Sequence, residues 1–260
     1  MVLKLKKPLK VFLIVLFWFV IWEVASLLIN KPLLFPSPID VFIKLFELSA
    51  TKTFWENTLL SLGRVSLGIV IAIVLGALLA LLSSFSKLLY EVLYPLVTVV
   101  KSTPVASFII LVWIFIGNSA TPIVISALMV FPIVYANVYQ GIKSVDKNMI
   151  EVCKIYNISG KKIISSLYLP SVLPYFTSAL LSSIGLGWKA GIAAEVLCTP
   201  MKSIGRAIFD SKTYIEYVDL FAWTLTVIIL SLALEFALTK LIKLALKKHT
   251  VLPKGDKNGN

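Results

Sequence analysis

The sequence predicts an all-α integral membrane protein with about six transmembrane helices. Hydrophobic residues make up 58% of the 260 residues and charged residues only 15%, whereas a soluble domain has about 25% charged residues. A helix needs about 20 mostly apolar residues to cross a bilayer. Runs of that kind recur along the chain, and the alternating pattern of lipid-facing strands is absent. The runs are 11–29, 58–83, 91–117, 121–141, 172–197 and 218–239.

The first run is expected to remain in the protein as a span. Lysines precede it, as in a signal peptide, but its apolar part is too long and no A-x-A cleavage site follows. The segment KPLLFPSPIDVF (31–42) comes next. Because its prolines fix φ and remove backbone donors, we expect an extended, rigid lead into an amphipathic segment.

The third run is the least regular. Pro95, Lys101 and Pro104 interrupt it. A proline removes a hydrogen-bond donor and its ring clashes with the preceding turn. We therefore expect a kinked helix, or an interfacial helix followed by a short span.

The second and fifth runs are rich in small residues, which let helices approach closely where the hydrophobic effect cannot drive association in lipid. One interpretation is ordinary helix packing, and the other is that these two helices line a pathway or move against each other. The residues are Gly63, Gly68, Gly76 and Ala80 in the second run, and Gly185, Gly187, Ala190, Gly191, Ala193 and Ala194 in the fifth.

Basic residues gather in alternate connecting segments. They are concentrated in 1–10, 142–168 and 240–260, and they are sparser on the other side of the predicted spans. By the positive-inside rule this distribution predicts that both termini are cytoplasmic. Topology and anionic membrane lipid therefore account for the net charge of +12, and nucleic acid is not expected as a partner.

Residue types needed for catalysis or metal binding are scarce. Cys153 and Cys198 fall on opposite sides of the predicted membrane, and His249 is the only histidine. No metal site, cofactor or catalytic residue is predicted. The phosphate-binding pattern G-x-x-x-x-G-K-[ST] and the H-E-x-x-H pattern are also missing. The chain is therefore not expected to be an enzyme.

A polar insert, EVCKIYNISGKKIISSLYLP (151–170), separates the fourth and fifth runs. Either Asp146 or Asn148 can cap a helix at its start, and Asn148 has Glu151 at capping-box spacing. Met149, Cys153 and Tyr156 would then share one helix face.

The second half of the insert predicts a turn and another short helix. Asn157 sits where the first helix should stop, since Asn tolerates the left-handed conformation. Ser159 can cap a second helix over GKKIISSLY, and Leu169-Pro170 should end it. Such a pair of short helices suits either docking into the groove of a partner or lying on the lipid surface.

The insert resembles the cytoplasmic EAA loop of the permease subunits of bacterial ABC importers. Glu151-Val152-Cys153 stands at the E-A-A positions, and Leu169-Pro170 stands at the L-P positions. Asn157 replaces the glycine of that pattern. The resemblance implies that this loop binds an ATPase. The residues implied in ATPase coupling are Met149, Glu151, Cys153, Tyr156, Asn157, Gly160, Leu169 and Pro170.

Three further segments are similar to permeases of the nitrate/sulfonate/taurine type: LFPSPIDV (34–41), NTLLSLGRVSLG (57–68) and GWKAGIAAEVL (187–197). The resemblance implies the type I ABC importer permease fold in the bacterial inner membrane. Implied partners are a cytoplasmic ATPase dimer, an extracytoplasmic substrate-binding protein and a second permease copy, with a homodimer as the simplest completion. The implied solute is a small anion or a vitamin precursor.

The composition of the two ends and the resemblance of the part between them suggest a domain organisation. Residues 1–10 would be a basic cytoplasmic tail, 11–246 the transmembrane permease domain with a coupling loop at 142–169, and 247–260 a disordered basic cytoplasmic tail. The chain itself would supply the pathway, and ATP hydrolysis would reside in a separate partner chain.

Charged residues near the outer ends of the second and fifth runs are candidates for an outer gate. A charge in a membrane is costly unless it is paired, wet or snorkelling, and all three of these interpretations remain open. Lys189 and Glu195 are six residues apart, so they lie on different helix faces. Each is expected to find a partner on another helix or to line the pathway. The candidates are Arg64, Trp188, Lys189 and Glu195, although Trp188, like Trp223, is more typical of an interface anchor.

An ion-coupled secondary transporter with a lipid-surface loop is the main alternative. Such transporters need no ATPase, but they commonly contain inverted repeats with broken helices. No repeat of that kind is evident in this chain.

Overall fold

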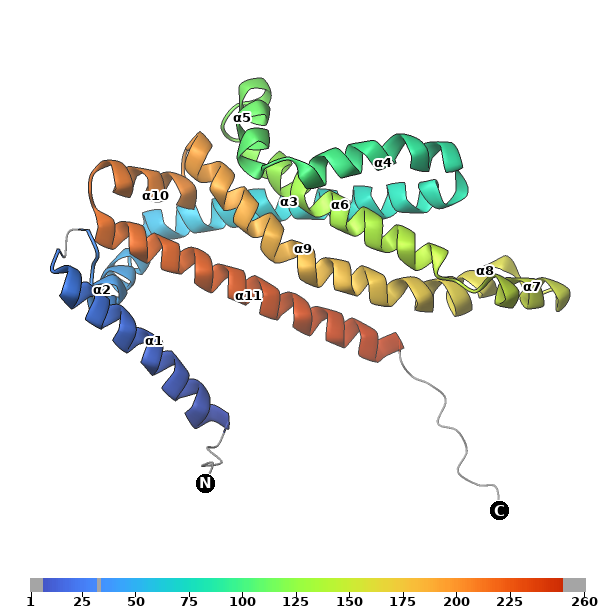
Figure 1. Ribbon diagram of the computed structural model, residues 1–260, viewed down its shortest axis with the longest axis horizontal. Helices are drawn as coiled ribbons and strands as arrows, with labels where there is room; N and C mark the ends of the chain where they lie inside the picture. Colours follow the sequence, from blue (N-terminus) through green and yellow to red (C-terminus); the bar gives the residue numbers. More distant parts are fainter. Residues whose placement is uncertain (1–6, 32–33, 250–260) are drawn as a thin grey trace, which may run out of the picture. The chain divides into compact units, whose positions relative to one another are not determined.

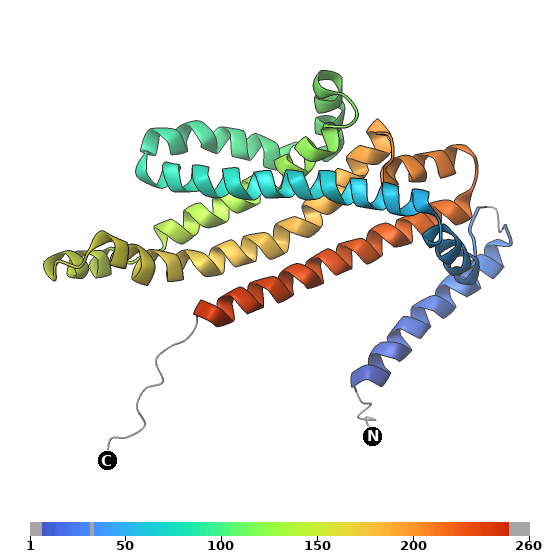
Figure 2. The same ribbon diagram turned by 180° about the vertical axis from the view of Figure 1, so that it is seen from behind.

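The computed structural model describes residues 7–31 and 34–249, and this part of the chain contains helices and no strand. Figures 1 and 2 show these helices from two sides. In chain order they are α1 (Lys7–Ile29), α2 (Pro38–Ser49), α3 (Lys52–Phe85), α4 (Lys87–Ser102), α5 (Val105–Ile116), α6 (Thr121–Lys143), α7 (Lys147–Ile155), α8 (Gly160–Ile163), the π-helix η1 (Ile164–Tyr168), α9 (Leu169–Cys198), α10 (Ile204–Thr213) and α11 (Tyr217–His249).

Five of these stretches are long and apolar enough to cross a membrane. They comprise α1, α3, α6, the continuous stretch from α8 to α9, and α11. Helices α4 and α5 meet at a bend of 110° and count as a sixth span if taken together (Figure 1). The prediction of about six spans with an interrupted third one is therefore confirmed.

The described residues form two compact units. Of the described residues, the first unit comprises those up to residue 63 and 192–229, and the second comprises 64–191 and those from residue 230 to 249. Each unit has apolar side chains in its interior, for example Val41 in the first and Ile125 in the second.

In the first unit, the proline-rich segment leads into a helix as predicted. The Ser37 hydroxyl accepts a hydrogen bond from the Asp40 amide at 3.2 Å, and Pro38 occupies the first helical position of α2. The segment is tied to α1, because the Trp22 indole donates to the carbonyl of Pro36 and the Ser26 hydroxyl donates to the carbonyl of Phe35. These bonds satisfy backbone groups that the prolines leave without helical partners.

Helix α10 was not predicted from the sequence. It begins at a serine cap, where the Ser203 hydroxyl accepts from the Arg206 amide at 3.0 Å. The turn before it places Thr199 and Lys202 at positive φ (47° and 51°), a conformation that side chains other than Asn and Asp rarely adopt. The sequence does contain the serine cap, but no run of apolar residues marked the helix.

In the second unit, glycines allow close helix packing. A Cβ atom at Gly68 would overlap the backbone carbonyl of Ile123 in α6. Gly187 similarly faces Val130, and Gly191 faces Ser126. These contacts support the packing interpretation of the small residues.

The predicted end of the second short helix at Leu169-Pro170 is wrong. The chain continues from α8 through η1 into α9, and the Leu169 amide donates to the carbonyl of Ile164 five residues earlier. Pro170 is the second residue of α9 and follows the π turn directly. The wider π turn just before it makes room for the proline ring, which would clash with the preceding turn of a regular α-helix.

The predicted tails fall largely outside the described residues. Helix α1 already begins at Lys7 and α11 extends to His249. Residues 1–6 and 250–260, which make up most of both tails, lie outside the described part of the chain.

Candidate functional site

Helices α7 and α8 lie beyond the ends of α6 and α9 in the second unit, as both views show (Figures 1 and 2). Asp146 caps α7, with its Oδ1 accepting from the Asn148 amide at 2.8 Å. Asn148 therefore lies inside α7, and the capping box that pairs it with Glu151 does not form. The first of the two caps considered from the sequence is the one used.

Helix α7 presents an apolar face to its surroundings. The four large apolar residues on this face are between 46% and 76% exposed, whereas Cys153 is half-buried. The exposed face is thus centred on Val152 rather than on the predicted line through Cys153. Glu151 is exposed beside it. The four residues are Met149, Val152, Ile155 and Tyr156.

The turn after α7 depends on Asn157, which has a φ of 53° as predicted. Its amide donates to the carbonyl of Lys154 at 3.1 Å, and the Ile158 amide donates to the carbonyl of Cys153 at 2.9 Å. This pair of bonds is a Schellman motif, which satisfies the last carbonyls of a helix. The motif fixes the direction in which the chain leaves α7.

We expect Asn157→Gly to preserve the turn and Asn157→Val to disrupt it, because a β-branched residue is strained at positive φ. In the purified protein, limited proteolysis within 150–165 should be much faster for the valine variant than for the wild type or the glycine variant. Equal cleavage rates in all three proteins would contradict a requirement for the left-handed conformation.

The remaining residues of the predicted coupling set follow the turn. A Cβ atom added at Gly160 would meet nothing within 4 Å, and Leu169 and Pro170 are exposed. Of the predicted set, the residues of α7 and Asn157 adjoin one another, because the Schellman turn directly follows the helix.

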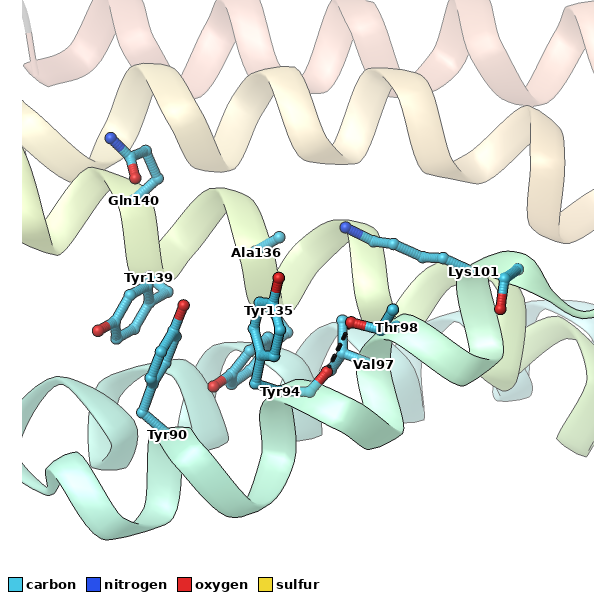
Figure 3. A pocket seen from close by; sticks show the side chains of 10 residues that line it. Tyr90, Tyr94, Val97, Thr98, Lys101, Tyr135, Ala136, Tyr139 and Gln140 are labelled. Atoms are coloured by element: carbon cyan, nitrogen blue, oxygen red, sulfur yellow. Dashed lines mark hydrogen bonds between the residues drawn. The ribbon is translucent and has the colours of Figure 1, made fainter.

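A cavity of about 490 Å³ lies in the second unit between α4 and α6 (Figure 3). Figure 3 shows the extended Lys101 side chain pointing along it toward Tyr135. This site was not predicted from the sequence. Tyrosines four residues apart on both helices were the available signal. The lining residues are Tyr90, Tyr94, Val97, Thr98, Lys101, Ser102, Tyr135, Ala136, Tyr139 and Gln140.

Glu195 is fully buried in the first unit, and snorkelling is therefore wrong for this residue. Its Oε2 accepts from the Ser61 hydroxyl at 2.6 Å and from the Gly205 amide at 3.2 Å. Ser61 in turn accepts from the Ile204 amide at 2.9 Å. The carboxylate thus joins α3 and α9 to the first turn of α10, which confirms that it has partners on other helices.

The other predicted gate residues belong to the second unit. Arg64 is half-buried, and Lys189 is exposed. Trp188 is fully buried, and in the first unit Trp223 is only 5% exposed and stacks on Phe54. Both indoles pack inside the protein, so the interface-anchor interpretation of these two tryptophans is wrong. The proposed outer-gate constellation remains a prediction.

Residues 68–248 match the family of binding-protein-dependent transport system inner membrane components. The chain is a permease subunit of an ABC importer. Most of the described helices, including α7 and both helices beside the cavity, fall within the matched residues. This assignment excludes the secondary-transporter alternative. The chain is a transport subunit and a multi-pass membrane protein.

The permease aligns with curated relatives over most of its length. It is 28% identical to a probable ABC transporter permease of Haemophilus influenzae, over 93% of this chain and 97% of that one. It is 28% identical to a formylaminopyrimidine transport permease of Halalkalibacterium halodurans (68% and 71% covered). A nitrate import permease of Synechococcus elongatus is 30% identical (74% and 72% covered).

A solved structure has the same fold as the permease. A bacterial ABC transporter involved in the import of the acidic polysaccharide alginate aligns with a TM-score of 0.60 at 16% identity, over 91% of this chain and 94% of that one. This likeness confirms the all-helical ABC importer permease fold. Membership of the family also implies an ATPase and a substrate-binding protein as partners in general.

Proposed function

We propose that the permease forms the pathway for a small anion or vitamin precursor and is driven by a separate ATPase that binds α7. The names of its relatives support this range of solutes, since one is a nitrate importer and another a formylaminopyrimidine transporter. The chain itself lacks the glycine-rich phosphate-binding pattern of an ATPase. Energy must then come from another chain.

The observation that carries this proposal is the exposed apolar face of α7. Ile155 and Tyr156 are the most exposed members of this face, at 76% and 75%. An apolar helical face outside the spans is stabilised when it is buried in the groove of a partner. The Schellman turn at Asn157 holds this face in a fixed direction, so force applied to α7 can reach η1 and α9.

The position of α7 also supports an orientation. Lysines lie within the helix, at 147 and 154, and on both sides of it, at 143, 161 and 162. By the positive-inside rule they favour a cytoplasmic location for α7 and both termini. The substrate-binding protein would deliver solute at the opposite side of the bacterial inner membrane. A second copy of the permease would complete the pathway, with one ATPase of a dimer bound to each copy.

The test is co-purification of an ATPase with the tagged permease from its native host in mild detergent. Ile155→Asp combined with Tyr156→Asp should remove the ATPase, because it introduces charges into the apolar face. Lys154→Gln is the matched control, since residue 154 lies about 200° around the helix from Val152. It should retain the ATPase.

Two results would contradict the proposal. One is retention of the ATPase by the double variant at the wild-type level. The other is absence of any ATPase from the intact wild-type preparation, with α7 binding instead to vesicles of anionic lipid. That second result would favour a helix that lies on the membrane surface.

A further inference from the structure

We propose that the cavity between α4 and α6 binds a small oxyanion, with Lys101 as its cation and tyrosine hydroxyls as its neutral donors. The proposal rests on the proposed transport function, because it narrows the class of solute that this part of the pathway accepts. The charges, hydrogen bonds and ring contacts of the lining residues each support it.

The charges of the two helices favour an anion. Helices α4 and α6 contain three lysines, at 87, 101 and 143, and one carboxylate, Glu91. Glu91 Oε1 lies 3.5 Å from Lys87 Nζ, and neither residue lines the cavity. The lining therefore contains an ammonium group and no carboxylate, so an anion is attracted and a cation is repelled.

The position of Lys101 in its helix suits a cation. Lys101 lies in the last turn of α4, where the negative end of the helix dipole stabilises a positive charge. Its side chain runs along the cavity in Figure 3. The ammonium group is thus placed to meet a ligand in the cavity.

Hydroxyl donors remain available around this charge. Thr98, Ser102 and Tyr135 donate within the protein, to the carbonyls of Tyr94 and Val99 and to Ser83 Oγ, respectively. Among the residues that the structure describes, the phenol hydroxyls of Tyr90, Tyr94 and Tyr139 take part in no hydrogen bond. An oxyanion accepts such bonds, and phenol O–H groups supply them at no charge.

The packing of the rings disfavours a flat neutral heterocycle. Tyr90 and Tyr139 stack at 4.6 Å between ring centroids with an interplanar angle of 16°, and Tyr139 also stacks on Tyr135. The ring faces that these three tyrosines turn toward one another are therefore not open to a ligand. A pyrimidine would need a free ring face for stacking, whereas an oxyanion needs the hydroxyl edges.

A single ammonium group also suits a site of passage. A transported ion must bind well enough to enter and weakly enough to leave. One cation with neutral donors supplies an attraction without the fixed second charge that would trap the ion. The cavity therefore fits a transient stop better than a storage site.

The experiment uses the tagged permease complex from its native host in lipid nanodiscs. Its unfolding temperature is measured while sodium nitrate, bicarbonate or methanesulfonate replaces sodium chloride at constant ionic strength, with 4-aminopyrimidine as a neutral probe. The variants are Lys101→Gln and Lys101→Arg. Lys87→Gln is the matched control, because it removes a charge from the same helix outside the cavity.

At least one oxyanion should stabilise the wild type more than chloride does. Its apparent Kd should rise about tenfold or more in Lys101→Gln, as expected for the loss of one charge-assisted hydrogen bond, and stay unchanged in Lys101→Arg and Lys87→Gln. An equal response in Lys101→Gln would overturn the proposal. So would a wild type that responds to no oxyanion, or only to the neutral probe.

The same preparations separate this proposal from the proposed function. The amount of co-purifying ATPase is measured in each. If anion binding is absent while the ATPase is still present, the result contradicts the proposed anion site and leaves the proposed role of α7 untouched. Absence of the ATPase from the wild type contradicts the coupling role of α7, whatever the anion titration shows.

Discussion

Gly205→Ala should remove most of the folded permease from the membrane, whereas Gly63→Ala should leave its yield unchanged. A Cβ atom at residue 205 would collide with Glu195 Cβ, with the Glu195 carbonyl carbon and with the Val196 nitrogen. Two of these three atoms belong to the backbone of α9, which cannot move aside as a side chain can. We expect a destabilisation of about 3 kcal/mol or more, at the upper end for overpacking.

Gly63 provides the control in the same unit. A Cβ atom there meets nothing within 4 Å, and alanine favours a helix over glycine by roughly 0.5–1 kcal/mol. Fluorescence size-exclusion profiles and unfolding temperatures of both variants make the comparison. A well-behaved Gly205→Ala protein with the unfolding temperature of the wild type would show that α10 does not pack against α9 as described.

The second large effect is expected for Glu195→Ala. This exchange leaves the Ser61 hydroxyl and the Gly205 amide without their acceptor. A buried donor without a partner costs about 1–3 kcal/mol, so we expect a clear loss of thermal stability and a faster cleavage of the chain between 199 and 216.

Glu195→Gln separates a structural role from a role in an outer gate. Both hydrogen bonds end on one oxygen, Oε2, and a glutamine amide oxygen can take that place. The glutamine variant should therefore keep these two bonds and fold better than the alanine variant, and any loss of uptake at normal yield would indicate a need for the charge itself. If glutamine and alanine at residue 195 destabilise the protein equally, acceptance of these hydrogen bonds by a side-chain oxygen is not what stabilises the fold.

Much of the fold could be predicted from the sequence because lipid imposes strong rules on it. Apolar runs of about 20 residues have few alternatives to a spanning helix, so the span prediction was confirmed. Pro104 likewise indicated the bend between α4 and α5, whereas α4 continues through Pro95. The positive φ of Asn157 followed from the local preference of one residue type.

Features that depend on contacts between distant residues could not be predicted in this way. Glu195 looked like a charge near a membrane interface, and its burial is understood only from partners such as Ser61, which is 134 positions away, and the Gly205 amide. Trp188 and Trp223 looked like interface anchors because an indole suits both a lipid interface and a packed interior. The cavity between α4 and α6 forms where faces of these two helices meet, and their positions in the sequence do not show that they do.

The π turn of η1 affects the direction in which α7 and α8 point relative to α9. A π turn holds an additional residue compared with an α turn, and each residue of an α-helix advances the azimuth by about 100°. The rotational phase between α8 and α9 is therefore offset from that of an uninterrupted helix. Two permeases with the same exposed residues on this loop, but with and without the extra residue, would point them in different directions. A chimera that exchanges loops between relatives has to preserve this phase as well as the exposed residues of α7.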